Sequence, residues 1–182
     1  MTQRAGDEVS YVITYLEMAG KPTYPYPPMP AGGPTVLLAA DEPPVRHFLN
    51  MYDAVGSDYE WTDQHKKPSL EIQEFLHDPY VTMFTLMRNG WPAGFYILDA
   101  RNSGECDLAY FGLVPEAVGL GLGTFLLHTA ILMGWKLPGV RKMTVNTNSL
   151  DHPCALPLYQ KAGFAPIRSV EKKRFLTRDR QH

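Results

Sequence analysis

The sequence has few cysteines and no histidine pair at a metal-ligand spacing. Cys106 and Cys154 are its two cysteines, and their separation matches neither a metal-binding nor a redox motif. The six histidines are scattered along the chain, so we expect no metal site. The sequence has no signal-peptide pattern, and we expect free thiols and a cytoplasmic location.

An excess of charge of one sign and long apolar runs are also missing. Lys and Arg total 17 against 19 for Asp and Glu, a formal net charge of −2. This balance gives no electrostatic case for nucleic acid or an anionic membrane as the main partner. No apolar run approaches the roughly 20 residues that a membrane-spanning helix needs. The basic cluster near the C-terminus is interpreted as a solvated strand and tail: Lys172, Lys173, Arg174, Arg178 and Arg180.

The composition is typical of a globular protein, with 45% hydrophobic and 20% charged residues. A length of 182 residues suits one domain, so we expect a single domain over residues 1–182 with loose termini at 1–7 and 177–182. Residues 9–18 are rich in β-branched and aromatic side chains and predict a strand. Six prolines between 21 and 34 exclude helix and central strand. Tyr24, Tyr26 and Met29 favour an ordered loop there over a disordered linker.

Two helices and three strands are predicted next. One helix runs from the Pro43-Pro44 pair to about Val55, and a second begins at a capping Ser69, with Leu70, Ile72, Phe75 and Leu76 mostly on its buried side. Strands follow at 81–88 and 93–99, joined by an Asn89-Gly90 turn. Residues 106–114 are apolar almost without alternation, which is typical of a strand buried on both faces. A helix at 120–137, a strand at 142–147, a helix at 153–161 and a strand at 166–176 complete an α/β (α+β) order.

A glycine-rich loop over residues 115–124 joins the apolar strand to a helix. Gly119, Gly121 and Gly123 alternate with Leu120 and Leu122, so the backbone can approach a ligand closely and direct amide N–H groups at a pyrophosphate. A P-loop would need a Lys-Ser/Thr pair where Thr124-Phe125 stands, and the dinucleotide fingerprint lacks its last glycine and its acidic residue. Tight packing of the helix on the sheet is the non-functional alternative.

The loop residues 118–123, Val-Gly-Leu-Gly-Leu-Gly, resemble the acyl-CoA signature Q/R-x-x-G-x-G/A of the GNAT superfamily. Residues 155–164, Ala-Leu-Pro-Leu-Tyr-Gln-Lys-Ala-Gly-Phe, are similar to the A-x-x-L-Y-x-x-x-G-F helix of the same family. Both motifs occur in the family's order with a strand between them, and the likeness extends over about residues 81–167. Residues 150–153, Leu-Asp-His-Pro, favour a bacterial branch.

The resemblance implies a mixed, mostly antiparallel twisted sheet of six to seven strands flanked by about four helices. It implies acetyl-CoA as cosubstrate and no metal. The loop from Val118 to Thr124 would hold the CoA phosphates, with Gly119, Leu120, Gly121, Leu122 and Gly123 acting through their backbone. Backbone groups of Phe111, Gly112 and Leu113 would pair with the pantetheine amides.

Two positions depart from the family pattern. Val118 stands where the family has Gln or Arg, and His152 stands where it has Asn. Asn148 or His152 would then contact the pantetheine arm. These departures keep a second reading open, in which the chain senses acyl-CoA without turnover. A third possible function is that of a nucleotide-binding α/β protein.

The family mechanism is direct attack of an amine on the thioester, so the resemblance implies no Ser or Cys nucleophile. Tyr159 would be the general acid near the departing sulfur, since a phenol is neutral at pH 7 and can donate a proton. Its alternative role is packing. Asp107 would be the general base, with Glu105 as the fallback; a solvated carboxylate at a strand end is the alternative.

The acceptor is predicted to be a small primary amine or an amino-acid-like metabolite rather than a large polycation, because the sequence has no strong acidic cluster. Aromatic side chains that would line its pocket, or else belong to the core, are Tyr24, Tyr26, Tyr52, Tyr59, Trp61 and Tyr110. We expect a monomer or a homodimer, with neither nucleic acid nor membrane as partner.

Overall fold

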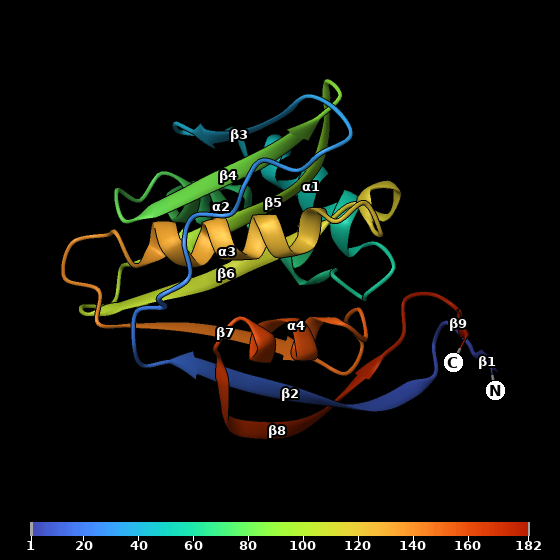
Figure 1. Ribbon diagram of the computed structural model, residues 1–182. Coiled ribbons are helices and arrows are strands. Elements are labelled where there is room, and N and C mark those ends of the chain that lie inside the picture. The colour runs from blue at the N-terminus through green and yellow to red at the C-terminus, as the bar shows by residue number, and fades with distance from the viewer. Residues whose placement is uncertain (1, 182) are drawn as a thin grey trace.

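A twisted seven-stranded sheet forms the centre of the molecule (Figure 1). The computed structural model describes residues 2–181. The strands are arranged in the order β3 (Thr35–Ala40), β4 (Val81–Arg88), β5 (Trp91–Asp99), β6 (Glu105–Leu113), β7 (Lys142–Asn148), β2 (Glu8–Met18) and β8 (Ala165–Phe175). Every neighbouring pair is antiparallel except β6 and β7, which are parallel. The expected mixed, mostly antiparallel α/β sheet is confirmed.

The helices cover both faces of this sheet. Adjacent residues of a strand point to opposite faces: a Cβ at Gly112 would meet Val55 of α1 (Val45–Gly56), and Leu113 lies against Gly123 of α3 (Leu122–Gly134). Helix α1 therefore packs on one face, together with α2 (Ser69–Leu76), and α3 packs on the other. The short α4 (Ala155–Lys161) contacts β8 (Figure 1). No helix in residues 2–181 is long and apolar enough to cross a membrane.

Strands β6 and β7 pair over only three residues, which opens the sheet. Residues 105–107 lie opposite residues 142–144, and no further pairing joins the two strands over the described residues. Beyond this point the two strands diverge, so that β6 keeps hydrogen-bonded contact with β5 alone, as far as Leu113. The divergence leaves a wedge-shaped opening between the halves of the sheet, next to the glycine loop.

The proline-rich segment 21–34 is ordered, as predicted, and crosses over α3 to reach β3 (Figure 1). Tyr24 stacks on His128 of α3 with ring centroids 4.2 Å apart, and its hydroxyl donates to the carbonyl of Ala162. The guanidinium of Arg88, only 4% exposed, donates to the carbonyls of Pro30, Ala31 and Gly33. Stacking and hydrogen bonding thus fix a segment that has no regular structure of its own.

Some predicted elements differ from the structure. The pattern predicts no strand between the proline segment and the first helix, yet β3 pairs along β4 as an edge strand. Ser69 is not a cap: it is the first residue of α2, the preceding residue is Pro68, and no side chain caps the helix. Leu70 is 64% exposed instead of buried, because it lies on the outer side of this short helix.

The two chain ends and β6 also depart from expectation. Thr2–Gln3 (β1) pairs antiparallel with Arg180–Gln181 (β9), so the described parts of the ends form a small second sheet where loose termini are predicted. In β6, only Cys106 and Leu108 are fully buried, and residues 109–113 are half-buried. Residues 108–113 line the cavity beside this opening, so residues 109–113 are covered only in part.

Candidate functional site

A cavity of about 760 Å³ lies in the opening between β6 and β7. Its walls are residues 108–113 of β6, the glycine loop, the end of β7 and the start of α4. On the other side the cavity reaches α1 and the segment between α1 and α2, where Tyr52 of the helix and Tyr59 and Trp61 of the segment line it. The cavity therefore joins the glycine loop to an aromatic region formed by a distant part of the chain.

The glycine loop has the backbone conformation that its sequence predicts. Gly119 and Gly121 adopt φ values of +84° and +74°, where a side chain is strained. A Cβ on either would meet no atom within 4 Å, so both face open space. Gly121 is the residue before α3, whose first N–H groups are directed to the same side. This combination of free amides and the positive end of a helix dipole suits an anionic group such as a pyrophosphate.

The predicted loop residues do not all reach the cavity. Val118, Gly119, Gly121, Gly123 and Thr124 line it, whereas the side chains of the two leucines between the glycines do not. Leu120 is 50% exposed, and Leu122 is fully buried in the core.

The side of β6 that faces β7 carries unpaired backbone groups. Phe111, Gly112 and Leu113 pair with β5 through one side only and line the cavity with the other. An extended ligand with amide groups can add to such an edge as a further strand. A pantetheine arm has this character, so the residues present fit the chain of coenzyme A as well as its phosphates.

Tyr159 of α4 lies at the cavity wall, buried to 5% exposure. Its ring packs edge-on against Phe111 and Phe164, with centroids 5.9 and 6.2 Å away. Its hydroxyl makes no hydrogen bond to any described residue. Burial, with the negative charges of Asp151 and Asp107, raises the pKa of Tyr159 well above the ordinary value of a phenol. Tyr159 therefore stays protonated throughout the neutral range and can donate a proton to a group in the cavity.

Asp107 lies at the closed end of the opening, where β6 and β7 still pair. Burial raises its pKa to about 6, although the hydroxyl of Thr144, 2.6 Å away, donates to its carboxylate and favours the charged form. Asp107 is not among the residues that line the cavity. Glu105 is also outside it and forms an ion pair with Lys142, with 3.1 Å between carboxylate and ammonium. The raised pKa suits Asp107 to accept a proton near neutrality.

The acetyltransferase (GNAT) family model matches residues 48–164, nearly two thirds of the chain. The chain belongs to this family. The matched residues contain α1, the β4–β6 strands, the glycine loop, β7 and α4, so they include the cavity walls described above. A search of curated protein sequences found no match.

Solved structures of GNAT proteins have the same fold as this acetyltransferase-family chain. A GCN5-related N-acetyltransferase from Sphaerobacter thermophilus is 14% identical, with a TM-score of 0.60, over 96% of this chain and 53% of that one. A GCN5-related N-acetyltransferase from Kribbella flavida is 18% identical, with a TM-score of 0.57, over 88% of this chain and 56% of that one. A tandem GNAT protein of the clavulanic acid pathway is 16% identical, with a TM-score of 0.62, over 94% and 55%. The chain therefore spans little more than half the length of these proteins.

The aromatic side chains of this GNAT chain separate into two groups. Tyr52, Tyr59, Trp61 and Tyr110 line the cavity. Tyr24 and Tyr26, predicted as further candidates, do not: they belong to the proline-rich segment, and Tyr26 lies beside the ammonium of Lys136. These two tyrosines hold that segment on α3, so their role is packing.

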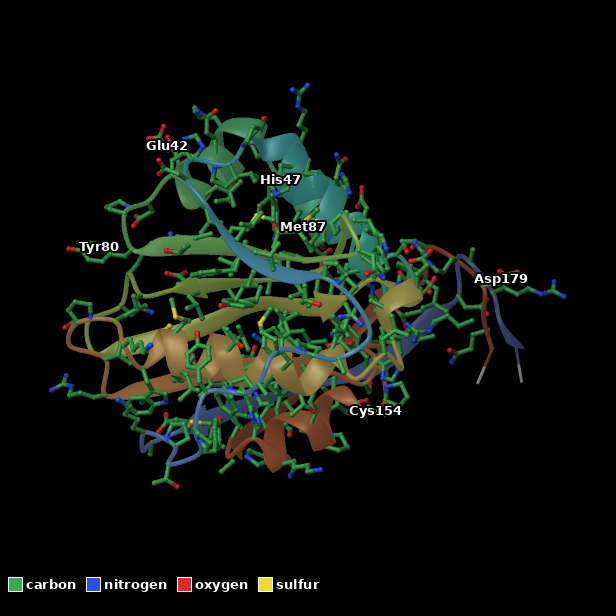
Figure 2. All side chains as sticks on the ribbon, turned by 45° about the horizontal axis from the view of Figure 1, so that its top comes forward. Glu42, His47, Tyr80, Met87, Cys154 and Asp179 are labelled. Carbon is green, nitrogen blue, oxygen red and sulfur yellow. The ribbon has the colours of Figure 1, made fainter. Side chains whose placement is uncertain are left out.

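Both candidates for the pantetheine contact, Asn148 and His152, line the cavity. Asn148 is the last residue of β7, and its side-chain oxygen accepts from the N–H of Leu150. His152 accepts from the N–H of Cys154. Cys154, the residue before α4, is labelled in Figure 2. Cys154 is exposed and Cys106 is buried, and both thiols are free, as predicted. Each polar side chain is thus held in a turn at the cavity rim.

The cavity also brings together charged side chains that no sequence motif assigns to a binding site. Glu60, Asp63, Asp151 and Arg174 all line it. Asp151 accepts from the indole N–H of Trp61 across 3.1 Å and from the hydroxyl of Thr147 across 2.8 Å. Arg174, interpreted from the sequence as part of a solvated strand and tail, has a side chain only 16% exposed. These residues are far apart in the chain, so the sequence does not predict that they form a cluster. The positive φ of Glu60, +64°, is likewise not predictable from the residues around it.

Proposed function

We propose that this protein transfers an acetyl group from acetyl-CoA to a primary amine of a small molecule. The observation that carries the proposal is the position of Tyr159 in the same cavity as the glycine loop and the unpaired edge of β6. Membership of the acetyltransferase (GNAT) family supports the reaction class. An aminoglycoside acetyltransferase from an uncultured soil metagenomic sample, solved with sisomicin, is 12% identical over 70% of this chain, with a TM-score of 0.56, and gives precedent for a small-molecule amine on this fold.

Binding falls to three parts of the chain. The amides around Gly119 and Gly121 and the start of α3 hold the phosphates, and the backbone of Phe111 to Leu113 orients the pantetheine arm. Asn148 and His152 lie at the rim, where either can contact that arm. Val118 replaces a side chain that assists phosphate binding in the family, so backbone amides provide most of this binding.

Two side chains of the protein then transfer protons, one from the amine and one to the departing sulfur. Bound acetyl-CoA supplies an activated acyl group as a thioester, and the amine forms the new amide bond while the thiol leaves. Asp107, with a pKa of about 6, takes the ammonium proton through water, because it lies outside the cavity wall. Tyr159 gives its proton to the departing sulfur. Both carboxylate and phenol are therefore in the protonation states that the reaction needs at neutral pH.

Replacement of Tyr159 by Phe tests the proposal and separates an enzyme from a sensor of acyl-CoA, the alternative that Val118 favours. We expect Tyr159→Phe to lower turnover about 100-fold or more, because a general acid contributes on that order. Affinity for acetyl-CoA should change little, since the ring remains. Turnover is measured by thiol release and by the mass of the product from acetyl-CoA labelled in the acetyl group.

Tyr96→Phe is the matched control. Tyr96 is also fully buried and its hydroxyl has no partner among the described residues, but it does not line the cavity. Loss of the Tyr96 hydroxyl should leave turnover unchanged. Acetyl-CoA binding without thiol release in the native protein, with any amine, would instead favour a sensor.

A further inference from the structure

The acceptor end of the cavity carries more negative than positive charge. Three carboxylates line the cavity, on Glu60, Asp63 and Asp151, against one guanidinium, on Arg174. Among the Asp, Glu, Lys and Arg side chains of the described residues that line the cavity, negative charges exceed positive ones by two. An acceptor that enters this space meets a field that favours cations.

Arg174 is already engaged by the protein. Its guanidinium lies 3.7 Å from the carboxylate of Glu60 and 3.9 Å from that of Asp63, and it donates to the hydroxyl of Thr62 across 3.0 Å. The carboxylate of Glu60 is 0% exposed and also accepts from the N–H and hydroxyl of Thr177. Arg174 and Glu60 therefore neutralise each other. The Nε of Arg174 has no partner among the described residues, but it is buried, which leaves it poorly placed to receive a carboxylate of the acceptor.

The other two carboxylates keep their charge toward the cavity. Asp151 accepts from the indole N–H of Trp61, the hydroxyl of Thr147 and the N–H of Asn148, which are all neutral donors. Asp63 pairs with Lys66 across 2.7 Å, but the side chains of both are more than 60% exposed. Such surface pairs contribute little, so Asp63 remains available to a second cation.

Aromatic rings adjoin these carboxylates. Trp61, Tyr52 and Tyr110 pack against one another, with ring centroids 5.3 to 6.1 Å apart, and all three line the cavity. A ring face attracts an ammonium group, and more strongly where water is excluded. A buried polar group independently marks the cavity as a ligand site, since the hydroxyl of Tyr159 has no protein partner in residues 2–181 and its side chain lies at the wall.

We propose that the acceptor is a dicationic amine, a linear diamine or polyamine. One amine loses its proton and accepts the acetyl group near Tyr159, while the second stays protonated against Asp63 and the Tyr52–Trp61 rings. This inference rests on the proposed function. It narrows the small primary amine expected from the sequence to one with a second cationic group, because the acidic cluster forms only when three separate segments meet in the fold.

Three acceptors with the same four-carbon chain provide the test: 1-aminobutane, 1,4-diaminobutane and 4-aminobutanoate. Their far ends are a methyl group, an ammonium and a carboxylate. We expect kcat/KM for the diamine to exceed that for the monoamine about three- to five-fold, the size that an ion pair with an exposed carboxylate allows. The amino acid should be the poorest of the three.

Asp63→Asn should remove the diamine's advantage, so that the ratio of kcat/KM for 1,4-diaminobutane to that for 1-aminobutane falls to about one. Asp58→Asn is the control: its side chain is 62% exposed, it also lies 3.9 Å from a C-terminal arginine, and it does not line the cavity. This control should keep the full diamine preference. Equal rates for diamine and monoamine, a preference that survives Asp63→Asn, or 4-aminobutanoate as the best acceptor would each overturn the inference.

Calorimetry of the same amines with the acetyl-CoA complex distinguishes the two proposals. If 1,4-diaminobutane binds in an Asp63-dependent way but no thiol is released, the dicationic site stands and the acyltransferase function fails. If thiol is released with no preference among the three amines, the function stands and the dicationic site fails.

Discussion

Asp107, the proposed base, is a half-buried residue whose catalytic role would have a cost in stability. Its carboxylate lies between β5 and β7, where Asp99 is its direct cross-strand neighbour and Thr144 donates to it. Burial raises its pKa from 3.8 to about 6. The folded protein thus holds this proton more tightly than the unfolded chain does. The stabilisation that follows is complete below about pH 4 and is lost as pH rises through about 6.

Replacement of Asp107 by Asn should therefore stabilise the protein and inactivate it. The free energy of unfolding should rise by about 1–3 kcal/mol at pH 8 and change little at pH 4, because the charged carboxylate is the costly form. Native kcat/KM should increase with pH through about 6 as the base ionises, and Asp107→Asn should lack this increase. Denaturant unfolding at both pH values and a pH–rate profile measure the two effects.

Asp99→Asn is the control for the sign of the change in the free energy of unfolding. Burial alone would raise the pKa of Asp99, but hydrogen bonds from Arg101 outweigh it and hold that pKa below its usual value. Its replacement should destabilise the protein at pH 8. An Asp107→Asn protein that is less stable at pH 8, or that keeps the native pH dependence, would refute the assignment of Asp107 as the base.

At the scale of elements, α3 provides a matched pair of glycines. Gly121 precedes the helix with φ +74° and Gly139 follows it with φ +76°, and a Cβ on either would meet no atom within 4 Å. Only Gly121 lines the cavity. Alanine at either position should cost about 1 kcal/mol of stability through its left-handed backbone.

The two variants should differ in binding. We expect Gly121→Ala to weaken acetyl-CoA about ten-fold or more, because its methyl group projects to the side where the phosphates approach, and Gly139→Ala to bind normally. Thermal unfolding and calorimetry measure stability and affinity. Equal affinities in the two variants would show that the loop does not hold the ligand.

Most elements could be predicted from the sequence because their signals are local. The Asn89-Gly90 turn has φ values of +50° and +84°, as a two-residue hairpin requires, and it joins β4 to β5 as predicted. The unit of strand, glycine loop and helix could be predicted from local sequence signals in the same way. In contrast, β3 was missed because its six residues follow a proline-rich segment and pair with a strand forty residues away. The Ser69 cap failed because the proline before it begins the turn instead.

The site was predictable only where a motif carries it. The loop glycines and Tyr159 lie in recognisable patterns, and the structure brings them to one cavity. Glu60, Asp151 and Arg174 come from three separate segments and carry no pattern. Tyr24 was a candidate pocket residue because it is aromatic. In the structure its ring stacks on His128 of α3, on the opposite side of the sheet from α1. Long-range contacts of this kind are decided by packing.

At the scale of the whole molecule, the fold separates two binding tasks. The divergence of β6 from β7 creates one cavity whose glycine-loop end suits anionic phosphates and whose far end gathers carboxylates and aromatic rings. Opposite local fields at the two ends would orient an anionic cosubstrate and a cationic acceptor toward Tyr159. The net charge of −2 for the chain conceals this arrangement.

The most direct test of the central claim is thermal unfolding with acetyl-CoA, with ATP and NAD measured alongside at equal concentration. Ligand at 100 times its Kd adds about 2.7 kcal/mol, which for a chain of this length raises Tm by about 5–10 °C. We predict such a rise with acetyl-CoA and a much smaller one with either nucleotide. No rise with acetyl-CoA, or an equal rise with ATP, would contradict the assignment of the cavity to an acyl-CoA thioester.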